Sequence, residues 1–444
     1  MSFWSTYKPH YRYLAKLGLP LVLGQLGLIV AGLADTLMVG GYGSRELAAA
    51  SFVNGVYVLG IVVLTGFSYG LTPLVGSLFG RGNREGIGEL LKNGLMANLI
   101  MGLVVSLLMW ILYFFLDKLG QPSQLLTLMR DYYSVMLVSI IFLALFNGFK
   151  QFADGIGDTP AGMWIMLAGN GLNIVLNYLF IFGKFGFPEW GLWGAGLATA
   201  ISRVLMGLAF LWLFLGTRRY AFYRTTFKMS VMRVSLMKKI TFTGLPVAVQ
   251  MGLETVSFSF AAMMMGWLGV TALAAHQILN TVGTICFMIY YGIGAAVSIR
   301  VSHFYGQHDL KEARRTASAG FHLIVVAFLF SGSLIFACRN YFSGWFTADT
   351  EVAATIATML PIFFLYQLGD GLQANFANAL RGTCDVKPVM YIAVFAYLVV
   401  NIPVGYFFGF VLDWGARGVW MGFPFGLTTA GILYFVRFRK QTGK

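Results

Sequence analysis

Three acidic residues each stand alone in a long apolar stretch of the sequence: Asp35 in 17–44, Glu254 in 240–299 and Asp370 in 352–380. A carboxylate in the middle of a membrane span costs at least about 2.5 kcal/mol to insert, so residues of this kind are candidates for functional sites. The chemistry open to such a carboxylate is the binding of a proton, a metal cation or a cationic substrate.

Two polar residues are spaced so that they accompany Asp370. Tyr366 and Gln373 lie four residues before it and three residues after it, which places all three side chains on one face of a helix. We expect a phenol, a carboxylate and an amide to line one cavity there. The alternative, that Asp370 only ties helices together through hydrogen bonds, is less favoured because an asparagine would do so at a smaller insertion cost.

Asp35 has candidate partners in the stretch 159–183. Asn173 and Asn177 are one helical turn apart, and a carboxylate with two amide oxygens is a set of hard-oxygen ligands that suits sodium and could equally hold a proton. Thr199, in the next apolar stretch, could add a hydroxyl. Asparagine within a span is also a common hydrogen-bonding residue between helices, and this structural interpretation stays open.

Two glutamines, Gln277 and Gln373, are candidates to line a substrate cavity. Gln277 and its neighbour His276 lie near the start of an apolar stretch, where contact with a helix end is the simpler interpretation. Aromatic residues make up 16% of the sequence and could bind flat organic cations by stacking and cation–π contacts. Packing or contact with lipid is the expected use of most of them.

The composition is that of a polytopic membrane protein. Hydrophobic residues make up 58% of the chain, charged residues make up 11%, and the mean hydropathy is +0.74, which leaves too little polar surface for a soluble globule. Cys286, Cys338 and Cys384 have no paired or metal-type spacing, so we expect no disulfide frame, no zinc site and no cofactor. The histidines show no spacing typical of a catalytic cluster, which argues against an enzyme.

The apolar stretches number twelve, six in each half of the chain. An offset of 226 residues pairs Gly18-Leu-Pro20 with Gly244-Leu-Pro246 and keeps register as far as Gly94 and Gly320, which indicates a tandem duplication. We therefore expect an all-α protein with twelve transmembrane helices in two pseudo-symmetric six-helix bundles. The expected domains are an N-terminal bundle at 1–216, a basic cytoplasmic linker at 217–239 and a C-terminal bundle at 240–444.

Positive charge is distributed unevenly between the loops. If both termini are cytoplasmic, the cytoplasmic segments hold 24 of the 31 Lys and Arg residues, as the positive-inside rule requires. The linker carries seven of them and no acid, and topology alone explains this run, so we expect no nucleic acid partner. Besides the three acids, Arg203 is the only charge that we expect inside a span.

The sequence resembles the multidrug and toxic compound extrusion (MATE) transporters, specifically the NorM branch, from its first to its last apolar stretch. The matching motifs are Gly32-Leu-Ala-Asp-Thr-Leu-Met38, Glu254 eight residues after Pro246, Ala274-Ala-His-Gln-Ile278, Ser298-Ile-Arg-Val-Ser-His303, Tyr366-Gln-Leu-Gly-Asp370 with Leu380-Arg-Gly382, and Ile402-Pro-Val-Gly-Tyr406. One departure is Asp154, at a short turn where the branch usually has glutamate.

This resemblance implies two six-helix bundles that alternate between outward and inward states, working as a monomer in the bilayer of a bacterial inner membrane. It implies export of amphipathic, often cationic drugs in exchange for inward sodium or protons. The positions of Glu254 and Asp370 would bind the coupling cation, Tyr366 would assist, and Asp35 would belong to an N-terminal cation site.

The asparagines near Asp35 favour sodium over protons as the coupling ion. Sodium would bind at Glu254 and Asp370, or at Asp35 with Asn173 and Asn177. The alternative function is a flippase for lipid-linked oligosaccharides from the same wider superfamily. Such a flippase would be expected to have a broad basic cavity for pyrophosphate, which a single arginine inside a span does not supply.

Overall fold

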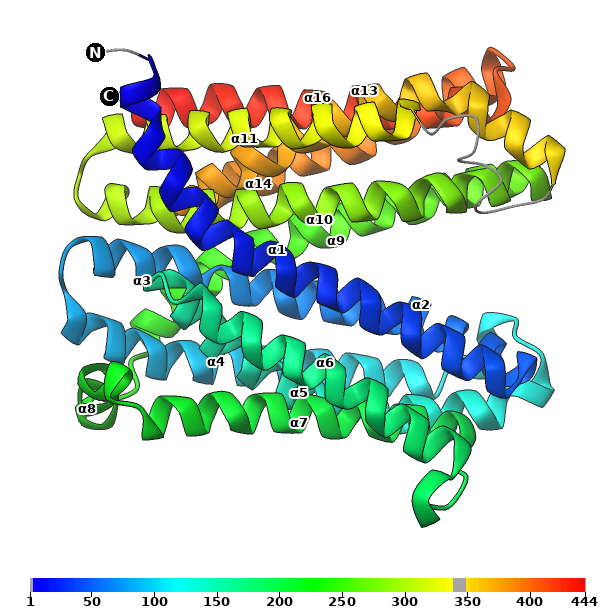
Figure 1. The fold of residues 1–444 in the computed structure, drawn as a ribbon, viewed down its shortest axis with the longest axis horizontal. Helices are drawn as coiled ribbons and strands as arrows, with labels where there is room; N and C mark the ends of the chain where they lie inside the picture. Colours follow the sequence, from blue (N-terminus) through cyan, green and yellow to red (C-terminus); the bar gives the residue numbers. More distant parts are fainter. Residues whose placement is uncertain (1–2, 338–348, 444) are drawn as a thin grey trace. The chain divides into compact units, whose positions relative to one another are not determined.

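The computed structural model describes residues 3–337 and 349–443, drawn as a ribbon in Figure 1. This part of the chain is almost entirely helical and contains no β-strand. Twelve of its helical segments are long and apolar enough to cross a membrane, and the shortest, Thr159–Phe182, has 24 residues. At about 1.5 Å per residue, that length spans the hydrocarbon core of about 30 Å. The prediction of an all-α protein with twelve membrane-spanning helices is confirmed, whereas Cys338 lies outside the described residues.

The helices form two compact units, which are described separately. The N-terminal unit is Leu23–Ala248, and the C-terminal unit combines Met1–Val22 with Val249–Lys444. Two long helices, α1 (Phe3–Tyr42) and α9 (Val234–Trp267), each contribute residues to both units.

The N-terminal unit contains seven further helices. They are α2 (Ser44–Tyr69), α3 (Leu71–Gly80), α4 (Arg84–Tyr113), α5 (Leu126–Gly155), α6 (Thr159–Phe182), α7 (Gly191–Gly216) and the short α8 (Ala221–Met229), with 3₁₀ turns η1 to η4 at Leu116–Leu119, Ser123–Leu125, Lys184–Gly186 and Arg218–Tyr220. Helices α2 and α3 are separated at Gly70. A Cβ at this position would lie 2.5 Å from the Cα of Gly244 in α9, so the two backbones approach this closely only because both residues are glycine.

The basic linker folds against the N-terminal unit. Asp158, at the turn before α6, accepts a hydrogen bond from Arg219 Nε at 2.9 Å and another from the Tyr220 hydroxyl at 2.6 Å. Burial raises the pKa of Tyr220 and the hydrogen bond to Asp158 raises it further, so the hydroxyl remains a donor. At the same turn, Asp154 pairs with Lys150 Nζ at 2.7 Å. Part of the linker's positive charge therefore neutralises a buried acid.

The C-terminal unit contains the end of α9 and five further long helical segments. These are α10 (Val270–Gly306), α11 (Leu310–Ala337), α13 (Thr350–Gly382), the segment formed by α14 (Val386–Ala393), η6 (Val394–Asn401), α15 (Ile402–Tyr406) and η7 (Phe407–Val411), and α16 (Gly415–Thr442). The segments η6 and η7 are π-helices. Pro403 lacks a backbone N–H, so it breaks the regular helical hydrogen-bond ladder between them.

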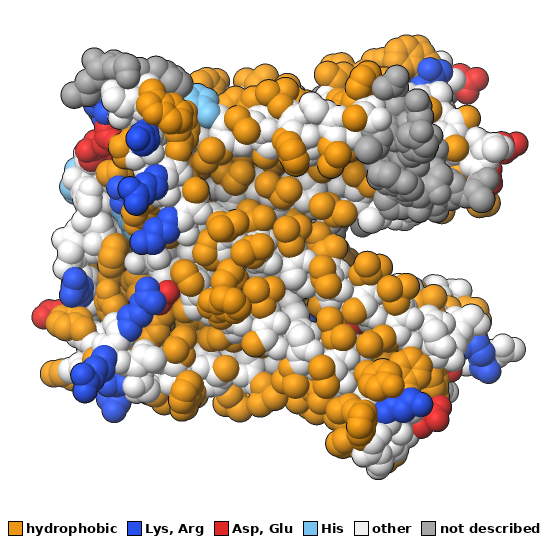
Figure 2. All heavy atoms as spheres, viewed as in Figure 1, with side chains coloured by type: hydrophobic (Ala, Val, Ile, Leu, Met, Phe, Trp, Pro, Cys, Tyr) orange, Lys and Arg blue, Asp and Glu red, His pale blue; other side chains and the backbone are white. Residues whose placement is uncertain are grey.

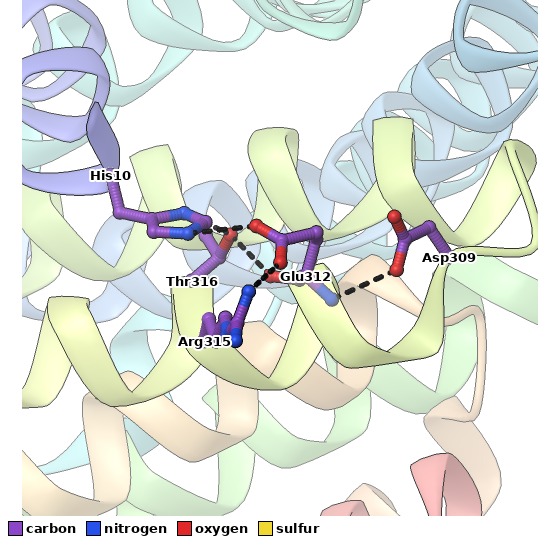
Figure 3. A network of polar contacts seen from close by, with 5 residues as sticks. All are labelled: His10, Asp309, Glu312, Arg315 and Thr316. Atoms are coloured by element: carbon purple, nitrogen blue, oxygen red, sulfur yellow. Dashed lines mark hydrogen bonds and ion pairs between the residues drawn. The ribbon is translucent and has the colours of Figure 1, made fainter. Parts of the chain in front are cut away.

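The first part of α1 is held in the C-terminal unit by polar contacts with α11 (Figure 3). His10 Nε2 lies 3.0 Å from Glu312 Oε2, and His10 Nδ1 lies 3.1 Å from Thr316 Oγ1. Glu312 also pairs with Arg315, and its backbone N–H donates to Asp309 Oδ1 at 3.0 Å at the start of α11. These contacts are one reason why the start of the chain belongs to the C-terminal unit, which differs from the division by chain order expected from the sequence.

The side chains of each unit are distributed along the helices as a membrane requires. Figure 2 shows hydrophobic side chains over the middle of the helices and Lys and Arg side chains gathered near helix ends. Large apolar side chains are exposed in mid-helix, including Leu107 and Leu108 on α4 and Leu329 and Phe330 on α11. Exposed apolar surface of this kind is suited to contact with lipid.

Candidate cation sites

In the C-terminal unit, Glu254 is half-buried in the part of α9 that follows Pro246. Gln250, one turn earlier in the same helix, donates from Nε2 to Glu254 Oε2 at 3.0 Å. Tyr397, Gln373 and Arg381 are close enough to act on the carboxylate as hydrogen-bonding or charged groups. Residues from α9, α13 and η6 therefore surround this acid.

Asp370 lies on α13 and is only 1% exposed. Its Oδ2 has no hydrogen-bond partner among the described residues. Glu254 acts electrostatically on Asp370, and Gln373, one turn after Asp370 on α13, is close to Glu254, so the two acids are candidates for one site. A buried polar atom without a partner is costly, and a proton or a bound cation would satisfy this oxygen.

Tyr366 and Gln373 are buried like Asp370, as the spacing on one helix face predicts. Gln373 Nε2 donates to the Tyr397 hydroxyl at 2.7 Å, while Gln373 Oε1 is buried without a partner in the described part of the chain. The Tyr366 ring packs among four other aromatic rings at centroid distances of 5.7 to 6.3 Å, those of Phe258, Phe363, Trp420 and Phe423. The site therefore combines hard oxygen ligands, which suit sodium, with an aromatic wall, which suits an organic cation.

Arg381 and Tyr397 are residues of this site that sequence reasoning missed. Arg381 is 4% exposed, donates to Gln250 Oε1 and donates from Nη1 to Asn378 Oδ1 at 3.3 Å. Arg381 is therefore a second basic residue beside a candidate site, in addition to Arg203. Arg381 comes directly after an apolar stretch, where a basic side chain ordinarily reaches the membrane surface, yet here it is buried and donates a hydrogen bond to Gln250 of α9.

In the N-terminal unit, Asp35 on α1 lies beside two asparagines of α6. Asn177 donates from Nδ2 to Asp35 Oδ1, and Asn173, with its amide nitrogen facing the acid, donates to the same oxygen at 2.9 Å. In this orientation Asn173 Oδ1 accepts from Thr199 Oγ1 at 3.3 Å. The four predicted residues therefore form one cluster. Amide nitrogens rather than oxygens face the carboxylate, so the amides would have to rotate to coordinate a cation.

A small cavity of about 80 Å³ adjoins Asp35. Its polar lining includes Asp35, Thr36, Asn54, Tyr132 and Thr199, and Tyr132 donates to Asn54 Oδ1 at 3.2 Å. Ligand pockets for drug-sized molecules run from about 300 to 1,000 Å³, so this cavity matches a small ion with water rather than an organic substrate.

Arg203 lies one turn beyond Thr199 on α7 and is held by neutral oxygens. Its Nη1 donates to the Tyr57 hydroxyl at 2.9 Å and to Ser139 Oγ at 2.8 Å. It also acts electrostatically on Asp35, so the N-terminal cluster contains a fixed positive charge as well as an acid.

The remaining candidates have simpler surroundings. Gln277 is exposed on α10, so its proposed place in a substrate cavity remains a prediction. His276 is buried, and its Nδ1 accepts from Trp420 Nε1 at 3.1 Å, which makes it a packing residue. Cys286 and Cys384 are free thiols, and the described part of the chain contains no group of three or more His, Cys, Asp or Glu residues that could hold a metal ion.

Comparison with known proteins finds one family over most of the chain. The model of the MatE family matches residues 20–179 and 246–407. A probable multidrug resistance protein NorM of Xanthomonas campestris is 31% identical over 96% of this chain and 93% of its own length. The multidrug resistance protein NorM of Vibrio cholerae is 29% identical over 96% of this chain and 94% of its own length.

Solved structures share the fold. The crystal structure of the eukaryotic MATE transporter AtDTX14 covers 99% of this chain and 98% of its own, with a TM-score of 0.87 and 21% identity. A crystal structure of MATE in the straight conformation covers 98% of this chain and 96% of its own, with a TM-score of 0.90 and 21% identity. The family model matches both halves of the chain, the described residues contain twelve candidate membrane spans, and relatives are similar over almost the full length. The chain belongs to the MatE family of membrane transporters.

Proposed function

We propose that this protein is a secondary active multidrug efflux antiporter that exports amphipathic, cationic compounds in exchange for inward sodium or protons by alternating access. The relatives from Xanthomonas campestris and Vibrio cholerae are named as multidrug resistance proteins, which supports small organic molecules as substrates. We place it in the inner membrane of a bacterium as a monomer with both termini in the cytoplasm. The two moving bundles would be the N-terminal unit at 23–248, which includes the linker at 217–239, and the C-terminal unit at 1–22 and 249–444.

The observation that carries the proposal is the environment of Asp370. Its carboxylate is buried in a membrane-spanning helix, one of its oxygens has no partner in the described part of the chain, and a second acid, Glu254, acts on it. Two carboxylates that share a low-dielectric site repel each other unless a proton or cation compensates at least one negative charge. Such a site is suited to binding cations in turn.

Competition for these carboxylates would couple the two fluxes. With Glu254 and Asp370 charged and free of ions, the site attracts an organic cation, and the rings around Tyr366 provide its apolar contact. When sodium or a proton arrives from outside, it compensates the same charges, so the affinity for the organic cation falls and the substrate is released outward. Return of the ion-loaded protein to the inward state completes the exchange.

The N-terminal cluster would bind a second coupling ion. The acid Asp35, the hydroxyl of Thr199 and Asn177 Oδ1, which has no hydrogen-bond partner in the described part of the chain, are oxygen ligands near a cavity large enough for a small ion with water. We assign to Asp35, Asn173, Asn177 and Thr199 a role in ion coupling, with sodium as the favoured ion. Gln277 is the remaining candidate for contact with substrate.

The test is efflux of ethidium, a fluorescent organic cation, from proteoliposomes that contain the purified protein. A sodium gradient and a pH gradient are imposed separately, and liposomes with the Asp370→Asn, Glu254→Gln double variant serve as the control. Efflux driven by sodium alone supports direct ion ligation by the acids and asparagines. Efflux driven only by the pH gradient supports proton exchange at the same acids, with the asparagines as structural residues. If neither gradient moves ethidium or other organic cations, the antiport proposal fails and the flippase function gains support.

A further inference from the structure

Arg381 and Glu254 are connected by a hydrogen-bonded relay through a single side chain. The guanidinium of Arg381 on α13 donates to Gln250 Oε1, and Gln250 Nε2 donates to Glu254 Oε2 at 3.0 Å. Gln250 is 1% exposed and Arg381 is 4% exposed, so the relay is screened little by water. The amide of Gln250 therefore directs its oxygen at the guanidinium of Arg381 and its nitrogen at the carboxylate of Glu254.

The hydrogen bonds of Arg381 differ from those of an ordinary arginine at a helix end. An arginine in the last turn of a helix is stabilised by the helix dipole and ordinarily caps the free carbonyls or extends into solvent. Here the two hydrogen bonds of the guanidinium go to side-chain amide oxygens, those of Gln250 and Asn378. No carboxylate pairs directly with Arg381 among the described residues, and Glu254 is a carboxylate on which its charge acts over a distance.

We propose that Arg381 is a positioning residue that sets the cation affinity of the Glu254 and Asp370 site through Gln250. Its fixed positive charge partly compensates the Glu254 carboxylate when no cation is bound, and the relay holds one carboxylate oxygen away from the incoming ion. The site then binds a coupling cation weakly enough to release it on the other side of the membrane. This inference rests on the proposed antiport function and adds the determinant of its ion affinity.

The experiment measures ethidium efflux from proteoliposomes as a function of the concentration of the coupling ion. Each variant gives a half-saturating ion concentration and a maximal rate. Arg381→Gln removes the nearby positive charge, so the half-saturating ion concentration should fall at least about threefold and the maximal rate should fall because the ion is released slowly. Arg381→Lys keeps the charge and should stay within about twofold of the parent value. Gln250→Met, a milder change of similar volume, should also lower the half-saturating concentration.

Three comparisons make the result decisive. Because Arg381 and Gln250 act as one relay, the double variant should shift the half-saturating concentration no further than the larger single change. Arg437→Gln is the matched control, because Arg437 is another arginine of the C-terminal unit but pairs with Asp385 at 2.7 Å; it should keep the parent ion dependence. If Arg381→Gln does not fold, the same comparison is made with Gln250→Met and Arg381→Lys.

The outcomes separate this inference from the function on which it rests. A parent protein whose ethidium efflux depends on neither ion removes the antiport proposal itself. If the parent depends on an ion but Gln250→Met and Arg381→Gln leave the half-saturating ion concentration unchanged, the relay alone is overturned. Additive shifts of the two variants would overturn it as well. A fall in maximal rate with no change in ion dependence also overturns it, because a merely structural arginine would give that result.

Discussion

Asn177 donates a hydrogen bond to the carboxylate of Asp35 across 142 residues of sequence. The Asn177 amide directs its N–H group, the positive end of its dipole, at the carboxylate. In this state the protein itself therefore provides the positive partner that a bound cation would otherwise provide. Asp35 therefore has two sets of partners available, the amide nitrogens or a bound ion. Exchange between them requires only rotation of side chains.

Replacement of this acid tests the N-terminal cluster. Asp35→Asn keeps the size of the side chain but removes its charge, so ion-driven ethidium efflux should fall by about tenfold, which corresponds to about 1.4 kcal/mol. The measurement is the initial efflux rate in proteoliposomes. Asp131→Asn, at an exposed acid of the same unit, is the control and should transport at the parent rate. Unchanged efflux by Asp35→Asn would remove the N-terminal cluster from the mechanism.

Asp370 provides the corresponding test in the C-terminal unit. Asp370→Asn should abolish most ion-dependent efflux, because Glu254 would then be the only acid left in the site. The change in ion dependence is read from efflux at a series of ion concentrations. Asp349→Asn is the matched control on the same helix, because Asp349 caps the start of α13 and asparagine is an equally good cap. If Asp370→Asn showed the same ion dependence of efflux as the parent, the assignment of Asp370 to the cation site would be contradicted.

The contact between Gly70 and Gly244 predicts an effect on stability. Gly70→Ala would place a Cβ 2.5 Å from a backbone atom of α9, so the helices would have to separate, at a cost of about 1–3 kcal/mol. Gly171 lies in the helix α6 and a Cβ there meets no atom within 4 Å, so Gly171→Ala should stabilise by about 0.5–1 kcal/mol. Thermal unfolding in detergent, followed by tryptophan fluorescence, should move in opposite directions for the two variants.

The hydrogen bond between Trp420 and His276 predicts a cost in stability when the tryptophan is replaced. Trp420→Phe would leave the buried His276 Nδ1 without its donor and would destabilise the C-terminal unit by about 1–3 kcal/mol. Thermal unfolding measures the loss, and Trp414→Phe, at an exposed tryptophan, serves as the control. A parent-like unfolding temperature for Trp420→Phe would refute this role of His276.

The sequence by itself determined the class of protein and the location of its acids. Twelve apolar stretches have to become helices because a bilayer offers no partner for free backbone groups, and an acid such as Asp370 is conspicuous within such a stretch. Helical periodicity also predicts that Tyr366 and Gln373 share a helix face with Asp370, since that spacing is local, and all three side chains are buried.

Only the tertiary structure decided how these side chains are paired. Arg381 follows an apolar stretch and would be expected to reach the membrane surface, yet it is buried and Gln250 of α9 accepts its hydrogen bond. The orientation of the Asn173 and Asn177 amides, and the attachment of His10 to α11 rather than to the helices next in the chain, likewise depend on contacts between distant residues. Such contacts leave no local period in the sequence, because hydrogen bonds between side chains depend on where helices meet rather than on residue spacing.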